Sequence, residues 1–441
     1  MRILFISFAL AFFLTCVSEH QDTLDDQLRF IINTSENSRG ISGYTMPGSL
    51  DFNNIPQDSK NPLSINKVEL GKLLFHETAF STAGNFDRLS QTYSCASCHH
   101  AGAGFQSGMM QGIGDGGIGF GMAGEGRVVD FEVAMNDIDV QALRTPSAMN
   151  GAYQTNVQWN GQFGATAINK GTEALWDDGT LLSLNRLGYE GLETQAIAGI
   201  DIHRISYTKE AIEALGYKDL FDEALSALPE DLRYSAEGAG LAIAAYERTL
   251  LSNRAPFQKW LRGDIDALTE EQKKGAILFF SSAQCNQCHY GPSLAGMEFH
   301  ALGFGDFDQR KVANFTADDP AMLGRGSFTQ KYSDNYKFKV PQLYNLKDSP
   351  FHGHGGTFNS IRDVIDYKNT AISQNQSVPT HQLSEDFKPL GLSQSEIDQI
   401  TDFIENGLYD PDLDRYVPDF VNSLSCFPNN DELSRQDLGC D

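Results

Sequence analysis

The sequence predicts a mainly helical protein in which one short motif occurs twice. Apolar residues recur at helical spacing in several segments, whereas the alternation typical of strands is sparse. The motif Cys-x-x-Cys-His stands at Cys95–His99 and again at Cys285–His289. With 441 residues, of which 41% are hydrophobic and 11% aromatic, the chain is long enough for two or three domains with cores of their own.

Cys-x-x-Cys-His is the attachment sequence of a c-type haem, whose porphyrin bonds to both thiols while the histidine ligates the iron. A redox dithiol or a zinc site built from both cysteine pairs would be the alternatives. The separation of the pairs is too long for an ordinary zinc ribbon, and neither pair lies in a βαβ pattern. We therefore expect two covalent haems c. The expected attachment residues are Cys95, Cys98, Cys285 and Cys288, and the expected iron ligands are His99 and His289.

The first residues are typical of an export signal. Arg2 precedes an apolar run, Ile3–Leu14, which is too short to span a bilayer. Residues 1–16 are therefore predicted to be a signal peptide, which agrees with haem attachment outside the cytoplasm. Cys16 could carry a lipid anchor, although Thr15 is larger than the residue usual before such a cysteine. We expect a periplasmic protein that is soluble or tethered only through Cys16.

The charge is strongly acidic. There are 58 acidic and 33 basic residues, and the formal net charge is −25. Such a surface repels nucleic acid and favours basic partners, for example a small basic electron carrier. Solubility alone is the alternative explanation. We expect no nucleic-acid partner.

The first half holds few regular elements. Residues 17–62 are polar and rich in turns and are predicted to be a leader. The first helical pattern is Ile65–Phe75, shortly before the first haem motif. Residues 102–126 hold eleven glycines and cannot form a stable helix or strand. They lack the Gly-Lys-Ser/Thr of a phosphate loop, so we expect a mobile loop over one haem face instead.

The second half contains clearer helical signals. Helical patterns run over Lys209–Leu228 and Ala236–Leu251. A capping box at Thr269–Gln272 opens a helix that runs up to the second haem motif. Another at Ser393–Glu396 opens a helix that ends at Gly407.

A domain boundary is predicted where Pro256 and Gly263 interrupt the helical pattern. In the tail, Cys426 and Cys440 could close a disulfide in an oxidising compartment, or remain two free thiols. The predicted division of the chain is an N-terminal haem domain at 63–258, a C-terminal haem domain at 259–424, and a tail at 425–441.

Short segments around both motifs form an ordered series. They are Leu70–Phe75, Arg144–Ser147, Trp159–Gly161 and Leu192–Ala196 in the first half, and Gly275–Phe280, Phe338–Pro341 and His354–Phe358 in the second. With this series, the chain from Leu70 to Gly407 resembles the bacterial di-haem cytochrome c peroxidases. It also resembles the related di-haem enzyme that matures a tryptophan-derived quinone cofactor.

The resemblance implies two mostly helical cytochrome c-like domains with one haem c each. The N-terminal haem would react with hydrogen peroxide, and the C-terminal haem would take electrons from a small cytochrome c or copper protein. Cleaving the O–O bond needs an open iron position, a proton handler and two electrons. The expected activity is that of a cytochrome c peroxidase-like oxidoreductase. The alternatives are an oxidase that modifies a protein or organic substrate through a high-valent bis-haem state, and a non-enzymatic two-haem electron shuttle.

The resemblance also implies roles for residues of the N-terminal domain. Trp159 matches the aromatic residue between the haems, an electron relay, unless it is simply a core tryptophan. Gln195 matches the distal-pocket glutamine. The family's acid–base glutamate has no counterpart, so His203 is the expected proton handler and Arg204 could stabilise the charge on the leaving oxygen. A surface His-Arg pair without a role is the alternative.

Other positions depart from the family. Leu143 and Arg144 stand where the family often has Arg-Asn, and that asparagine helps to bind an inter-domain calcium. Calcium is therefore in doubt, and Arg144 could supply positive charge instead. The sixth-ligand position of the C-terminal haem, Met or Tyr in known members, falls on Lys368, with Tyr367 beside it. Either ligand would give a lower potential than Met.

The N-terminal iron is expected to lack a second histidine ligand. Many family peroxidases rest with such a ligand from a loop just beyond the first motif. Here the nearest other histidine is His100, which is adjacent to His99 and cannot reach the opposite haem face. We therefore expect a five-coordinate or water-bound iron.

Overall fold

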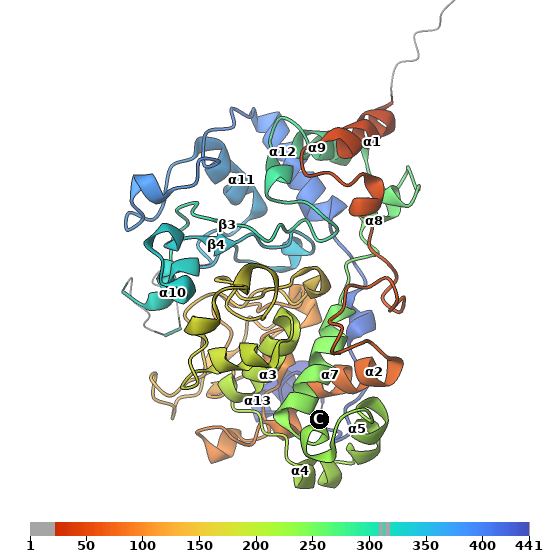
Figure 1. Cartoon of the computed structure of the whole chain (residues 1–441), viewed down its shortest axis with the longest axis vertical. Helices are drawn as coiled ribbons and strands as arrows, with labels where there is room; N and C mark the ends of the chain where they lie inside the picture. The colour runs from red at the N-terminus through yellow and green to blue at the C-terminus, as the bar shows by residue number, and fades with distance from the viewer. Residues whose placement is uncertain (1–22, 308–311, 314–317, 441) are drawn as a thin grey trace, which may run out of the picture.

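The computed structural model describes residues 23–307, 312–313 and 318–440. Within these residues the regular structure is mainly helical and each strand spans only two residues, which confirms the predicted helical class (Figure 1). The predicted signal peptide and Cys16 lie outside the described residues. Along the described part of the chain, every helix is too short or too polar to cross a bilayer.

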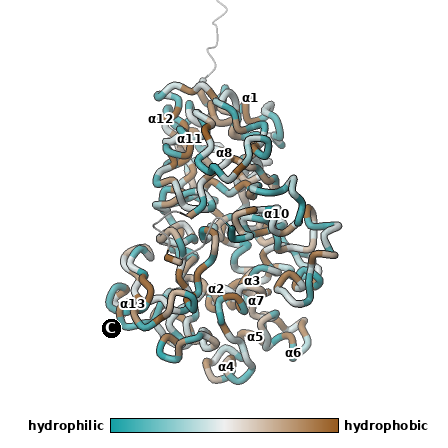
Figure 2. Tube along the Cα trace, turned by 90° about the vertical axis from the view of Figure 1, so that its left-hand side faces the viewer, coloured by the Kyte–Doolittle hydropathy of each residue, from teal (hydrophilic) through white to brown (hydrophobic). Residues whose placement is uncertain are grey.

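Among the described residues, the two larger hydrophobic cores occupy the lower and upper halves of Figure 1. The lower core is built mainly from the first half of the chain, and the upper core mainly from the second. The side view in Figure 2 shows the same two-part arrangement, with α2, α3 and α7 at one end and α8, α11 and α12 at the other.

Both ends of the chain cross this division. Part of the predicted leader is a helix, α1 (Leu24–Thr34), whose Leu28 and Ile32 are buried in the upper core. Conversely, Leu413 and Tyr416 from late in the chain belong to the lower core. Segments from both the beginning and the end of the described chain thus connect the two halves.

The lower half is built from short helices around the first motif. Gly71 brings α2 into close contact with α7, because a Cβ there would overlap the carbonyl oxygen of Ala242. The single helix predicted over Lys209–Leu228 is instead two helices, because Gly216 adopts a left-handed φ of +74° between them. The helices are α2 Ile65–His76, α3 Gly191–Ile202, α4 Lys209–Ala214, α5 Lys218–Ala224, α6 Glu230–Arg233 and α7 Ala236–Arg248.

The upper half repeats this arrangement. Gly275 brings α9 against α12, where a Cβ would overlap the carbonyl oxygen of Gln399. Both predicted capping boxes, at Thr269 and Ser393, are formed. In each half, the closely packed helix leads towards a haem motif. The helices are α8 Pro256–Leu261, α9 Glu270–Phe279, α10 Arg325–Thr329, α11 Ile361–Thr370 and α12 Gln394–Asp402.

The glycine-rich loop is held in place by a buried arginine and by the tail. Strand β1 (Gly117–Ile118) of the loop pairs with β2 (Val128–Val129), which directly follows the loop. The other half contains a similar two-residue pair, β3 (Phe299–His300) with β4 (Phe338–Lys339). Arg127 donates to the carbonyl oxygens of Ile113 and Gly114 at 2.6 and 2.8 Å. Through these hydrogen bonds the buried Arg127 side chain holds the backbone of the loop in place.

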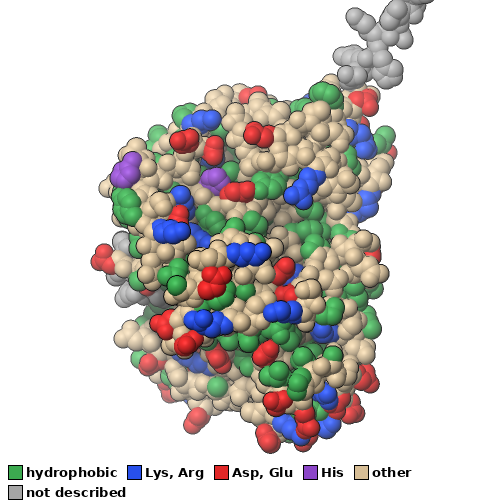
Figure 3. All heavy atoms as spheres, in the orientation of Figure 1, with side chains coloured by type: hydrophobic (Ala, Val, Ile, Leu, Met, Phe, Trp, Pro, Cys, Tyr) green, Lys and Arg blue, Asp and Glu red, His purple; other side chains and the backbone are tan. Residues whose placement is uncertain are grey.

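The tail packs against the same loop. Helix α13 (Glu432–Leu438) carries Asp437, whose carboxylate accepts hydrogen bonds from the backbone of Phe120 and Gly121. Cys426 and Cys440 form a disulfide with a Cα–Cα distance of 5.9 Å. On the face shown in Figure 3, basic and acidic side chains are interspersed.

Candidate haem-binding cavity

A cavity of about 680 Å³ lies between the two halves and reaches both haem motifs. It is lined by Cys98 and His99 from one side, and by Cys285, Cys288 and His289 from the other. A smaller cavity of about 50 Å³ lies behind the first motif. All four motif cysteines are free thiols, unlike the tail pair. The volume is that of a site for a sizeable organic ligand.

The two motif histidines are held in the same way. His99 Nδ1 lies 3.1 Å from the carbonyl oxygen of Phe105, and His289 Nδ1 lies 2.8 Å from that of Leu294. A carbonyl oxygen only accepts, so the proton is on Nδ1 and Nε2 remains free to ligate a metal. Burial lowers the pKa of both histidines to about 4, which keeps them in the neutral form that binds iron.

The helix before each motif also supplies matching aromatic packing. The ring centroids of Phe75 in α2 and His99 lie 6.4 Å apart, and those of Phe279 in α9 and His289 also lie 6.4 Å apart. The same local structure is therefore built twice. Its free thiols and oriented imidazoles fit a covalently bound haem at each motif.

Beside the first motif, Gln195 and His203 both line the cavity. Gln195 lies on α3 and His203 at its C-terminal end. His203 Nδ1 lies 2.8 Å from a carboxylate oxygen of buried Asp139. Burial alone would lower the pKa of His203, but the charge and hydrogen bond of Asp139 outweigh it and raise the pKa. The imidazole is thus oriented and able to carry a proton near neutral pH.

Arg204 is the one predicted catalytic residue that the structure does not bring to the cavity. Its guanidinium donates to buried Asp115 at 2.7 Å and to the carbonyl oxygen of Asp137 at 3.0 Å. Its backbone adopts a left-handed φ of +56°, which turns the chain directly after His203. Adjacent side chains therefore diverge, and this placement does not favour a role for Arg204 in charge stabilisation.

Trp159 lines the same cavity as both motifs. Its Nε1 donates to the carbonyl oxygen of Arg144 at 2.7 Å. The indole lies edge-on to His354, with ring centroids 6.3 Å apart, and His354 stacks on Phe338 at 3.7 Å. Trp159, His354 and Phe338 thus form a row of aromatic rings along the wall of the cavity.

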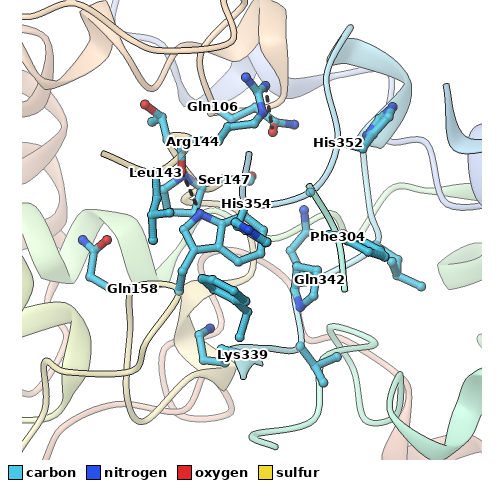
Figure 4. A pocket seen from close by; sticks show the side chains of 18 of the residues that line it. Gln106, Leu143, Arg144, Ser147, Gln158, Phe304, Lys339, Gln342, His352 and His354 are labelled. Atoms are coloured by element: carbon cyan, nitrogen blue, oxygen red, sulfur yellow. Dashed lines mark hydrogen bonds between the residues drawn. The ribbon is translucent and has the colours of Figure 1, made fainter. Parts of the chain in front are cut away.

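Arg144 lies beside Gln106 in the wall of the cavity (Figure 4). Its buried guanidinium donates to Ser107, Met109 and Met110 carbonyls, to the Gln106 amide oxygen and to the Ser349 hydroxyl. Burial lowers its pKa to about 9, so it stays charged at neutral pH. Carbonyl and amide oxygens are also the ligands that calcium prefers.

Lys368 and Tyr367 face different surroundings. Lys368 lines the cavity near the second motif, and its Nζ lies 3.3 Å from the carbonyl oxygen of Asp386. Burial lowers the pKa of Lys368, which favours the neutral amine that can ligate a metal. The hydroxyl of Tyr367 instead donates to the Leu302 carbonyl at 2.6 Å, and Tyr367 does not line the cavity.

Three cavity residues escaped the sequence reasoning. Asp139 is far from His203 in sequence and carries no local signal. Lys339 is buried and donates to Gln154, and burial lowers its pKa to about 7. Glu247 is the only carboxylate in the apolar run of residues 238–251.

Comparison with known proteins agrees with this site. Residues 65–266 match the model of the di-haem cytochrome c peroxidase family. The chain is 28% identical to methylamine utilization protein MauG of Methylorubrum extorquens, over 80% of each protein. It is also 28% identical to cytochrome c peroxidase Ccp of Escherichia coli, over 81% of this chain and 61% of that protein.

Among solved structures, a MauG-like protein associated with microbial copper homeostasis has the same fold. Its TM-score is 0.55 at 20% identity, with 83% of this chain and 95% of that chain covered. The family match, the similarity to both kinds of relative and the shared fold agree with one another. Residues 65–266 thus match the di-haem cytochrome c peroxidase family, and the relatives of the chain include MauG and the cytochrome c peroxidases.

Proposed function

We propose that the protein is a periplasmic di-haem peroxidase, which reduces hydrogen peroxide with electrons from a small cytochrome c or copper protein. The observation that carries this proposal is one cavity lined by both haem motifs, with Gln195 and the Asp139–His203 pair beside the first. Haem c would be bonded to the four motif cysteines, with His99 and His289 as iron ligands.

The residues beside the first motif suit peroxide reduction. The reaction H2O2 + 2H⁺ + 2e⁻ → 2H2O needs protons at the peroxide oxygens and electrons delivered one at a time. Bound haem supplies the redox-active iron. Protonated His203 holds a proton at Nε2, Asp139 orients the ring and stabilises its charge, and the Gln195 amide can hydrogen-bond peroxide. Trp159 lies between the halves, where it could relay electrons.

The decisive experiment mixes the reduced holoprotein with peroxide and follows the oxidation of a reduced small cytochrome c. The proposal expects catalytic consumption of that cytochrome. Rapid reaction with peroxide but no cytochrome turnover would instead favour an oxidase that modifies a protein or organic substrate. The similarity to MauG is the reason to test this alternative. No reaction of either haem with peroxide would favour an electron shuttle.

We further propose that Lys368 is the sixth ligand of the C-terminal haem. Lys368 lines the cavity, whereas the other candidate, Tyr367, does not. Lys368→Met is then expected to raise the potential of this haem by roughly 0.1 V or more, since axial ligands set haem potentials over a range of about 0.8 V. A redox titration measures the change. Tyr367→Phe is the matched control and should leave the potential unchanged, whereas a red absorption band of Met–haem ligation in the parent protein would contradict the assignment.

We also propose that the N-terminal haem is open to peroxide in the oxidised protein. His100 is buried beside Phe120, with ring centroids 5.0 Å apart, and does not line the cavity. Met122 is 92% exposed, and neither it nor Met110 lines the cavity. Electron paramagnetic resonance of the ferric protein should show a high-spin signal for about one of its two haems. Two low-spin haems that become mixed-spin in His203→Ala would show that His203 itself is the ligand.

For calcium, we propose that Arg144 takes the place of the ion. A guanidinium already donates to the oxygens that a calcium ion would need there. Export and anchoring through Cys16 stay predictions from the sequence.

A further inference from the structure

Glu247 is a buried side chain with no role in the function proposed above. It lies in the last turn of α7, is 7% exposed, and lines both the large cavity and the small one behind the first motif. Its Oε2 has no hydrogen-bond partner among the described residues. Arg248 does not neutralise it, because that guanidinium is bound to Glu193 at 2.7 Å and to Glu190 at 3.1 Å.

The surroundings of Glu247 favour its neutral form. Burial raises its pKa to about 8, the negative charge of Glu193 on α3 adds to this, and Arg248 on its own helix opposes it. At neutral pH Glu247 is therefore mostly a carboxylic acid. The other titratable groups that line the same small cavity are Tyr93, Cys95, Cys98, His99 and His203.

A buried carboxyl oxygen without a hydrogen-bond partner costs free energy, so the position of Oε2 calls for a ligand in the cavity. The same cavity holds Gln195 and His203, the residues assigned above to peroxide. Protonated His203 is a cation that pairs with Asp139. Protonated Glu247, in contrast, is a neutral acid. Two groups with such different environments can each deliver one proton.

We propose that Glu247 is a second catalytic proton donor of the N-terminal cavity and gives its proton to a peroxide oxygen. The proposal rests on the proposed peroxidase function. In H2O2 + 2H⁺ + 2e⁻ → 2H2O, the O–O bond breaks, one proton comes from His203 and one from Glu247, and both electrons come from the donor protein. Glu247 is left as a carboxylate and regains its proton from solvent between turnovers.

The test compares the holoprotein with Glu247→Gln, which keeps the volume and a polar group in the cavity. Glu237→Gln, in the first turn of α7 and away from the cavity, is the matched control. Infrared difference spectra between the oxidised and reduced proteins, in H2O and D2O, should show a carbonyl band of a protonated carboxylic acid. That band is expected in the parent and in E237Q but not in E247Q. The rate of reaction with peroxide should fall roughly 100-fold in E247Q and recover in part in Glu247→Asp.

Each other result overturns the proposal. A band that persists in E247Q shows that Glu247 is not the protonated acid. An unchanged peroxide rate in E247Q, with an active parent, shows that Glu247 is not a donor although the peroxidase function stands. If the parent itself does not react with peroxide, the proposed peroxidase function is wrong, and the proposal for Glu247 is overturned with it. A band that is lost in E247Q would then show only that Glu247 is protonated.

Discussion

Replacing His203 by glutamine is expected to slow the reaction of the holoprotein with hydrogen peroxide roughly 100- to 10,000-fold, the usual contribution of a positioned general acid. Glutamine keeps much of the volume but carries no transferable proton. The measurement is the second-order rate of haem oxidation after rapid mixing with peroxide. A rate within a few-fold of the parent would remove His203 from the mechanism.

The dependence on Asp139 supplies an independent check. Asp139 raises the pKa of His203, so the protonated imidazole persists to higher pH than in a free histidine. Activity that needs this proton should be full at low pH and fall as pH rises through the raised pKa. In Asp139→Asn the fall should move to lower pH. Asp137→Asn, at an exposed position of the same loop, should leave the profile unchanged.

The same pair links stability to pH. Because the folded-state pKa of His203 is raised, its pairing with Asp139 stabilises the fold fully below the unfolded-state pKa of about 6.5. That stabilisation is lost as pH rises through the folded-state pKa. Denaturant unfolding of the parent should show this loss, and Asp139→Asn should not.

The second large effect is expected at Arg144. Arg144→Asn should lower the free energy of unfolding by about 3 kcal/mol in the presence of a chelator, because several buried oxygens lose their donor. Excess calcium should recover part of this loss, since asparagine at this position resembles the calcium-binding members of the family. Denaturant unfolding with and without calcium measures both effects.

Arg186→Asn, at an arginine whose side chain is 51% exposed, is the matched control and should change stability little. The parent should unfold alike with calcium and with chelator. A parent that is destabilised by the chelator, or an Arg144→Asn variant as stable as the parent, would show that the guanidinium does not replace the ion.

The sequence alone determined the features that depend on neighbouring residues. The haem motifs are contiguous, so their thiols and imidazoles were identifiable without a fold, and the capping boxes at Thr269 and Ser393 are likewise local and were correct. The helix over Lys209–Leu228 was predicted too long, because Gly216 tolerates a left-handed φ that a hydrophobic pattern does not register.

Only the tertiary structure decided which side chains share the cavity. The partner of His203 is Asp139, 64 residues away, and Glu247 reaches the cavity only because α7 packs along α3 and α2. Arg204 is adjacent to His203 in sequence, yet a left-handed backbone turns it towards Asp115. Spacing along the chain fixes short-range geometry, whereas the direction of a side chain after a turn and the contacts between distant segments are set by how the helices pack.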